Sequence, residues 1–300
     1  MNSPWTPTQR LKLFWRKFKL QIPRNALVLE VGSGGAPHFH SDVLCDKYLN
    51  GKGTARVGRL KTDRPFVFGD AQALPFVDNA FDYIICFHVL EHLDNPENCL
   101  KELMRVGGAG YIETPCEIIE KIQGWCCHKW FVRVENEKLI LTQKSSPVFD
   151  SLLHITFHSL AAEENQAYLN FVFANRDLLT VKYEWRGDID YHISPVQGKE
   201  QFNGFEEPEL DILSVKDRDE EDINGNGYFQ FDEFAKACIY RVLQSRYRKR
   251  NLNLLDLLAC PICHKKIHFK QDRFICSHCK KYYPTKNSLP VLLPELAQSL

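Results

Sequence analysis

The chain of 300 residues lacks the features that define several large classes of protein. It has no run of about 18 apolar residues, so we expect no membrane-spanning helix. Its first twenty residues contain no apolar segment ending in small residues, so we expect no secretory signal and a cytoplasmic location. Its 38 basic residues balance 38 acidic ones, and this zero net charge gives no overall attraction to nucleic acid or to anionic membranes.

The composition is that of an ordinary globular protein, with 44% hydrophobic and 25% charged residues. This balance excludes a disordered or fibrous chain, and the length predicts about two domains. Eleven cysteines are present. In a reducing compartment, clustered cysteines bind metal more often than they form disulfides.

Charge shifts along the sequence indicate how the chain is divided. An acidic stretch begins near residue 206, and a basic one follows and ends at Arg250. We therefore predict a main domain at 1–205, a charged connecting region at 206–250 and a compact C-terminal domain at 251–300.

Short apolar runs in the first half predict buried parallel strands. A helix is expected between the last two, because apolar residues recur at helical spacing after Asn95-Pro96 and stop before Gly107-Gly108. This order predicts an α/β sheet with a ligand crevice at the carboxyl ends of its strands. The predicted strands are 26–31, 42–45, 65–68, 83–89 and 110–113, and the predicted helix is 95–106.

Acidic and glycine residues gather at these strand ends. A glycine-rich turn follows Glu30, Asp46 ends the second strand, and Asp70 ends the third. Such carboxylates can accept hydrogen bonds from ribose hydroxyls and from an adenine amino group. Only nine residues, 33–41, join the first two strands, which leaves little room for the helix that holds a dinucleotide's pyrophosphate.

The segment from Gly69 to Pro96 reads GDAQALPF, then FDYIICFHVLEH and LDNP. With the glycine turn, it resembles the class I S-adenosylmethionine-dependent methyltransferases over residues 24–116. The resemblance implies a Rossmann-like sheet with helices on both faces, and S-adenosylmethionine as cofactor. Glu30 and the turn would contact the methionine moiety, Asp46 the ribose and Asp70 the adenine. The implied cofactor residues are Glu30, Gly32, Ser33, Gly34, Asp46, Asp70, Ala71, Phe87 and His88.

Two histidines follow the fourth strand, where reacting groups lie in this fold. His88 is expected to line the donor pocket, and His92 is the candidate general base. The alternative for His92 is a structural histidine paired with Glu91 or Asp94. Two tryptophans farther along, in the segment 125–130, either form the acceptor pocket or pack at a helix end.

No metal is predicted at Cys126-Cys127-His128, because no fourth ligand lies at a suitable spacing. Residues 131–200 are interpreted as rich in strands that complete the sheet.

Two Cys-x-x-Cys pairs lie near the C-terminus, separated by twelve residues. Four thiolates at this spacing form a closed tetrahedral zinc site, which supplies folding energy that a fifty-residue domain lacks. The predicted zinc ligands are Cys260, Cys263, Cys276 and Cys279.

The residues around these cysteines include Leu254 to Pro261, Tyr282-Tyr283-Pro284 and Leu289 to Leu293. Over residues 253–294 they resemble the small zinc-ribbon family that activates tRNA, rRNA and translation-factor methyltransferases. The resemblance implies an activator fused to its enzyme, with the ribbon docked in cis on residues 1–205.

The connecting region contains a calcium-loop pattern. Positions 1, 3, 5, 6 and 12 of an EF-hand loop are matched, although no second loop accompanies it. Calcium binding and a plain acidic turn are both open interpretations. The candidate ligands are Asp222, Asn224, Asn226, Tyr228 and Glu233.

Two basic stretches, 12–19 and 241–250, either bind RNA or an anionic membrane or are solvated helix faces. The favoured function is thus a methyltransferase with an unknown acceptor, for which a small molecule, lipid or sugar is preferred. The alternatives are a tRNA, rRNA or translation-factor methyltransferase, and a non-catalytic methyltransferase-like scaffold.

Overall fold

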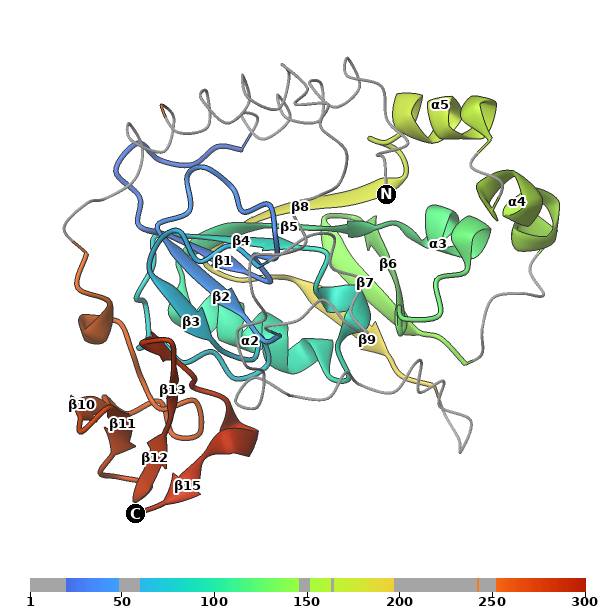
Figure 1. Ribbon diagram of the computed structural model, residues 1–300. Coiled ribbons are helices and arrows are strands. Elements are labelled where there is room, and N and C mark those ends of the chain that lie inside the picture. Colours follow the sequence, from blue (N-terminus) through green and yellow to red (C-terminus); the bar gives the residue numbers. More distant parts are fainter. Residues whose placement is uncertain (1–19, 49–59, 146–151, 163–164, 197–241, 243–251) are drawn as a thin grey trace, which may run out of the picture. The chain divides into compact units, whose positions relative to one another are not determined.

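The computed structural model describes residues 20–48, 60–145, 152–162, 165–196, 242 and 252–300 (Figure 1). The calcium-loop pattern lies outside these residues, and so do both basic stretches except for Val242. The chain splits into two compact units, and each is described by itself. One comprises Ile22–Asp70, Pro75–Val77 and Pro208–Leu300, and the other comprises Met1–Gln21, Ala71–Leu74 and Asp78–Glu207.

The first unit begins with three buried parallel strands in the order β3-β2-β1. They are β1 (Val28–Val31), β2 (Val43–Asp46) and β3 (Phe66–Phe68). Every residue of the three strands is buried, as expected for parallel strands covered on both faces. Only turns and irregular backbone connect β1 to β2. The prediction that no crossover helix separates them is therefore confirmed.

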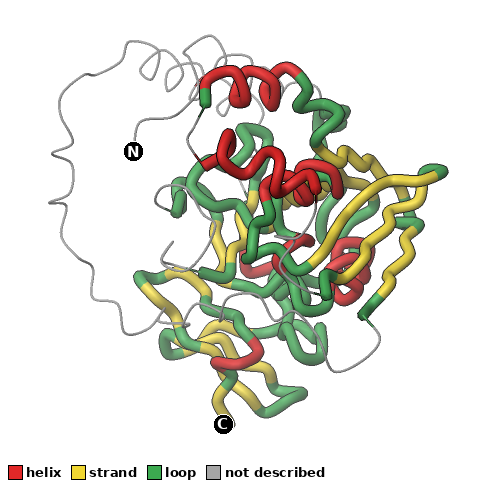
Figure 2. The backbone as a smooth tube through the Cα atoms, turned by 90° about the vertical axis from the view of Figure 1, so that its right-hand side faces the viewer, coloured by secondary structure: helices red, strands yellow, loops and turns green. Residues whose placement is uncertain are grey.

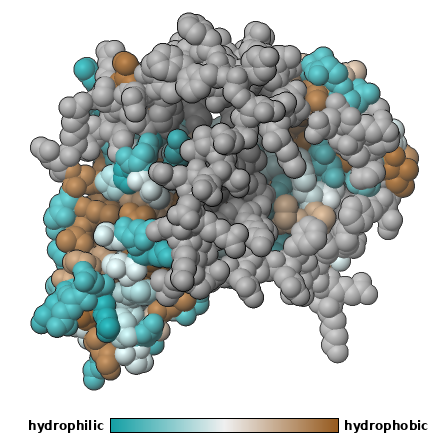
Figure 3. All heavy atoms as spheres, in the orientation of Figure 1, coloured by the Kyte–Doolittle hydropathy of each residue, from teal (hydrophilic) through white to brown (hydrophobic). Residues whose placement is uncertain are grey.

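The C-terminal part of this unit consists of short strands, loops and short 3₁₀ helices (Figure 2). One antiparallel sheet has the order β10-β11-β12-β15, and β13 pairs with β14. The elements are η5 (Leu254–Asp256), β10 (His268–Lys270), β11 (Arg273–Cys276), β12 (Lys281–Tyr283), β13 (Thr285–Lys286), β14 (Leu289–Pro290), η6 (Pro294–Leu296) and β15 (Gln298–Ser299). The visible surface of this C-terminal part carries both hydrophilic and hydrophobic residues (Figure 3).

The C-terminal segment pairs with the edge of the parallel strands. The Leu292 amide donates a hydrogen bond to the carbonyl of Phe68, at 2.8 Å, and Val291 forms a parallel bridge with Phe68. A second pairing joins Phe76 to Leu258. The expected docking of this segment on residues 1–205 is visible in these contacts.

Apolar burial supports the same pairing. Val291 and Leu293 are fully buried, and burial stabilises each side chain by about 1.5–3 kcal/mol. Their shared core cluster contains Leu44, Phe66, Phe68, Val291 and Leu293.

The second unit contains the parallel strands β4 (Tyr83–Phe87) and β5 (Ala109–Pro115), joined through α2 (Pro96–Val106). The α2 helix begins where predicted, because the Asn95 side chain accepts a hydrogen bond from the Asn98 amide and Pro96 occupies the first turn. The strand β8 (Thr180–Arg186) extends this sheet antiparallel to β5.

The interpretation of residues 131–200 as mainly strands was incomplete. The strands β6 (Trp130–Glu135), β7 (Lys138–Gln143) and β9 (Tyr191–Ser194) form a separate sheet in the order β6-β7-β9. Between them lie two helices that the sequence did not indicate, α4 (Leu152–Ala162) and α5 (Gln166–Ala174). The short helix α3 (Glu117–Gln123) precedes β6.

The predicted fold class is confirmed as a Rossmann-like mixed α/β fold with a small C-terminal domain that carries four clustered cysteines. Within the described ranges, no helix is long and apolar enough to cross a membrane.

Candidate cofactor and metal sites

The turn after β1 depends on its glycines. Gly32 and Gly34 have φ values of 69° and 54°, in the left-handed region that favours glycine. The amides of Gly32 and Ser33 donate to the carbonyl of Cys45 in the neighbouring strand. The Ser33 hydroxyl is buried and has no hydrogen-bond partner among the described residues. The turn thus brings backbone and a hydroxyl to the end of β2.

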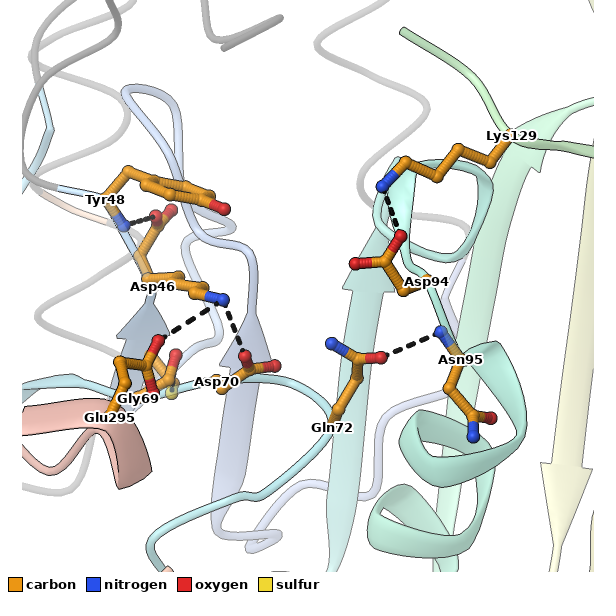
Figure 4. A network of polar contacts seen from close by, with 11 residues as sticks. Asp46, Tyr48, Gly69, Asp70, Gln72, Asp94, Asn95, Lys129 and Glu295 are labelled. Atoms are coloured by element: carbon orange, nitrogen blue, oxygen red, sulfur yellow. Dashed lines mark hydrogen bonds and ion pairs between the residues drawn. The ribbon is translucent and has the colours of Figure 1, made fainter. Parts of the chain in front are cut away.

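Asp46 ends β2 beside this turn. Its Oδ2 accepts a hydrogen bond from the Gly34 amide at 2.9 Å. Its Oδ1 accepts one from the Tyr48 amide at 3.1 Å (Figure 4). These backbone donors fix the orientation of the carboxylate. Because a carboxylate can accept about four hydrogen bonds, an oriented Asp46 is suited to hydroxyl groups such as those of ribose.

Glu30 lies at the other side of the turn and is 2% exposed. Its Oε2 accepts hydrogen bonds from the His38 amide at 2.7 Å and from the Ser41 hydroxyl at 2.6 Å. The side chain therefore shapes the connection from β1 to β2. A contact with the methionine moiety of a donor stays a prediction.

Asp70 follows β3 and is paired with a lysine. Lys47 Nζ lies 2.9 Å from Asp70 Oδ2 and 3.4 Å from Glu295 Oε1, which belongs to η6 (Figure 4). Burial alone would lower the pKa of Lys47, but the Asp70 carboxylate outweighs burial and raises it. Lys47 is therefore a permanent cation that joins the end of β3 to the C-terminal segment.

In the second unit, His88 follows β4 with a left-handed φ of 53°. Its Nδ1 lies 3.3 Å from Glu91 Oε1, and its Nε2 lies 3.7 Å from Glu113 Oε1. Burial lowers the pKa of His88, but these two carboxylates raise it to about 9. At neutral pH His88 is an imidazolium, which can donate hydrogen bonds but cannot accept a proton. Phe87 and Ala71 also belong to this unit, and Ala71 is buried.

His92 ends the 3₁₀ helix η2 (Leu90–His92). Its Nδ1 lies 3.2 Å from the carbonyl oxygen of Cys127, and its ring makes an edge contact with His128 at 4.5 Å between centroids. One ligand atom from each of His92, Cys127 and His128 lies within 4.8 Å of the others. Its role as a general base stays a prediction.

The structure thus places His92 beside Cys127 and His128, although Cys127 lies 35 residues farther along the sequence. Cys126 does not belong to this cluster. Local spacing could not reveal the grouping, because His92 comes from a different element. The one sequence signal that pointed to a function for His92 was its position after a predicted strand.

Buried charges surround His128. Its Nδ1 lies 2.6 Å from Glu120 Oε2, and Lys144 Nζ contacts the other oxygen of Glu120. Burial lowers the pKa of His128, but hydrogen bonds to Cys127 and Glu120 raise it to about 9. Burial raises the pKa of the Cys127 thiol, but His128 and His92 lower it to about 6. The cluster favours a thiolate.

The two tryptophans have different surroundings. Trp130 is 4% exposed and donates a hydrogen bond from Nε1 to the carbonyl of Leu93. The ring of Trp125 lies 5.0 Å from that of His128, and its carbonyl accepts a hydrogen bond from Lys144 Nζ. Trp130 is therefore packed in the interior, and an acceptor pocket in this segment stays a prediction.

The four C-terminal cysteines come together as predicted, with their sulfur atoms within 4.8 Å of one another. Cys263 Sγ lies 3.6 Å from Cys276 Sγ, and the Cys279 amide donates to Cys276 Sγ. Cys260 and Cys276 are fully buried. Four thiolates with a backbone donor fit a structural Zn²⁺, which these residues would hold with no open position.

The comparisons with known proteins agree with both halves of this description. Residues 49–110 match the family described as "Methyltransferase domain". A relative, ajmaline N-methyltransferase of Rauvolfia serpentina, is 33% identical over 99 residues, which are 29% of this chain. The chain spans 34% of the length of that relative. The chain carries a methyltransferase domain.

A second sequence similarity is to a small protein of a different family. A UPF0434 protein of Hamiltonella defensa subsp. Acyrthosiphon pisum (strain 5AT) is 44% identical over 50 residues, which are 16% of this chain and 85% of that protein. Through this segment the chain belongs to the UPF0434 family. The length of the UPF0434 match agrees with the fifty-residue zinc ribbon predicted at the C-terminus.

Among solved structures, one that resembles the chain contains the Trm112 methyltransferase activator and a methyltransferase of Haloferax volcanii. The similarity has a TM-score of 0.34 and 13% identity, over 61% of this chain and 90% of that one.

Proposed function

We propose that the chain is an S-adenosylmethionine-dependent methyltransferase that its own zinc ribbon stabilises in cis. The observation that carries the proposal is the oriented carboxylate of Asp46 beside the Gly32–Gly34 turn. Both lie directly before residues 49–110, which match a methyltransferase domain. The cofactor supplies a methyl group on a sulfonium, which is already an activated electrophile. The protein mainly has to bind, orient and exclude water.

Asp46 would hold the ribose hydroxyls, because its carboxylate is positioned by two backbone amides. Asp70 would receive the adenine amino group, and Ala71 would lie beside the base. Glu30 keeps the turn in shape through the His38 amide.

Phe87 and His88 are proposed to line the methyl-donor side. The imidazolium of His88, held by Glu91 and Glu113, would act as a hydrogen-bond donor rather than as a base.

The ribbon supports the proposed donor site through two kinds of contact. Backbone pairing joins Leu292 to Phe68 at the end of β3, directly before Gly69 and Asp70. Lys47 then links Asp70 to Glu295. Loss of the ribbon would remove both contacts, so we infer that the ribbon fixes the position of Asp70.

The preferred acceptor is a small molecule, lipid or sugar. Two relatives favour this choice by name, because one acts on ajmaline and another, of Paenarthrobacter aurescens (strain TC1), on demethylmenaquinone. Methyl-labelling of a cell extract with the purified protein, followed by separation into RNA, protein and small molecules, tests it. Label in RNA or protein would contradict the preference.

Donor binding is tested by calorimetric titration of the full chain with S-adenosylmethionine. We expect binding in the wild type and at least a tenfold loss of affinity for Asp46→Ala. Asp78→Ala is the matched control, because Asp78 is an acidic residue whose side chain is 66% exposed. Absence of binding in a folded wild type, or equal affinities for the two variants, would refute the proposal.

A further inference from the structure

The cluster at His92, Cys127 and His128 is not used by the proposed donor site. All three residues belong to the second unit, and their ligand atoms lie within 4.8 Å of one another. In a tetrahedral zinc site, neighbouring ligand atoms lie about 3.4–3.6 Å apart, as the usual zinc–ligand bond lengths require. Small rotations of the three side chains would bring their ligand atoms to the separations of a zinc site.

The two imidazoles are oriented as metal-binding histidines usually are. Nδ1 of His92 lies 3.2 Å from the Cys127 carbonyl oxygen, and Nδ1 of His128 lies 2.6 Å from Glu120 Oε2. When an acceptor holds Nδ1–H in this way, Nε2 carries the lone pair that can bind a metal. Both rings therefore have the orienting partner that a ligand histidine needs.

A buried carboxylate next to the cluster supplies an independent observation. Glu91 is 1% exposed, and its Oε2 has no hydrogen-bond partner within the part of the chain that the structure describes. It interacts electrostatically with both His92 and His128. A buried carboxylate oxygen without a partner costs free energy, and a cation nearby would remove that cost.

We propose that His92, Cys127 and His128 bind a second divalent transition metal, best fitted by Zn²⁺. Two imidazoles and one thiolate match the ligand preference of zinc. Three protein ligands leave a fourth position for water beside Glu91, unlike the closed four-sulfur site of the ribbon. His92 is then a metal ligand rather than the free base that its place in the sequence suggested.

Metal content of the full chain tests this proposal. Mass spectrometry of protein purified without chelators should find two zinc ions per wild-type chain and one per Cys127→Ser chain. Cys126→Ser is the matched control and should keep two, because the neighbouring thiol lies outside the cluster. The remaining ribbon zinc reports that the ribbon of the Cys127→Ser protein has folded.

Cobalt substitution gives a second measurement that needs no variant. Charge-transfer absorption from thiolate to Co²⁺ scales with the number of thiolates. After four thiolates bind the first equivalent, a second equivalent should add about a quarter of that absorption. A single metal in the wild type, equal metal content in both variants, or a second equivalent without a thiolate band would overturn the proposal. The cluster would then be a hydrogen-bonded ion-pair network.

Neither measurement involves S-adenosylmethionine. The metal proposal and the proposed function can therefore fail separately.

Discussion

The two cysteine clusters of this chain are built in opposite ways. The ribbon cluster takes all four ligands from a span of twenty residues and surrounds them with a small domain of short strands. The cluster at His92 takes its ligands from a 3₁₀ helix and from the turn after α3, and buried charges surround it. The ribbon site is expected to hold its domain together, whereas the other site lies in a unit that has its own sheets and helices.

Loss of one cysteine sulfur should therefore affect stability differently in the two clusters. This difference is the largest effect that we expect. Cys276→Ser should unfold the ribbon, because structural zinc contributes on the order of 10 kcal/mol to the folding of such domains. Cys127→Ser should change the free energy of unfolding by less than about 2 kcal/mol, because the rest of its unit stays packed. Hydrogen exchange over residues 252–300 measures the difference. Retained protection in Cys276→Ser would contradict it.

The next effect concerns the packing of the ribbon on the parallel strands. Leu293→Ala should lower the free energy of unfolding by about 3–5 kcal/mol, because Leu293 is fully buried in the cluster with Phe66 and Phe68. Leu255→Ala, at a residue 43% exposed in the same segment, should cost less than about 1 kcal/mol. Denaturant titration of both variants gives the comparison. Similar losses would mean that the ribbon does not depend on this contact.

A smaller loss in the free energy of unfolding is expected for a substitution beside the cluster at His92. Lys144→Met removes a buried cation that contacts Glu120, and both residues are 1% exposed. Stranding one partner of a buried ion pair costs about 3 kcal/mol, and His128 still contacts Glu120, which keeps the loss near 2–3 kcal/mol. Lys138→Met, at a surface pair with Asp190, is the control and should be nearly neutral. Equal stability of the two variants in urea would argue against a buried charge network.

The smallest effect is a pH dependence at His88. Its pKa of about 9 exceeds the ordinary value of 6.5, so its stabilising effect is complete below pH 6.5 and is lost as pH rises through 9. His88→Gln should therefore destabilise the chain most near pH 6 and hardly at all near pH 10. The difference should stay below about 1 kcal/mol, because the side chain is 45% exposed. Thermal unfolding of both proteins across this range measures it, and a constant difference would contradict the assignment.

The features that could be predicted from the sequence are those that depend on residues close together in the chain. The strands β1 to β5, the cap at Asn95 and the zinc ligands were predictable, because hydrophobic period, capping residues and Cys-x-x-Cys spacing are local. The cluster at His92 was not predictable, because its ligands meet only through tertiary structure.

The helices α4 and α5 were missed for a different reason. Their apolar residues do not gather on one helical face, and Leu152, Ile155 and Phe171 are exposed, so the usual helical period is weak. One local signal was available. The Asn165 side chain caps α5 by accepting hydrogen bonds from the amides of Ala167 and Tyr168.

The most direct test of a methyltransferase stabilised by its own ribbon compares the full chain with a chain that ends at residue 250. Soluble yield and affinity for S-adenosylmethionine are measured for both, with the separately expressed segment 251–300 added back to the truncated chain. The account predicts a truncated chain of low solubility and weakened donor binding, with recovery when the segment is added. A truncated chain as soluble as the full one, with the same donor affinity, would contradict the account.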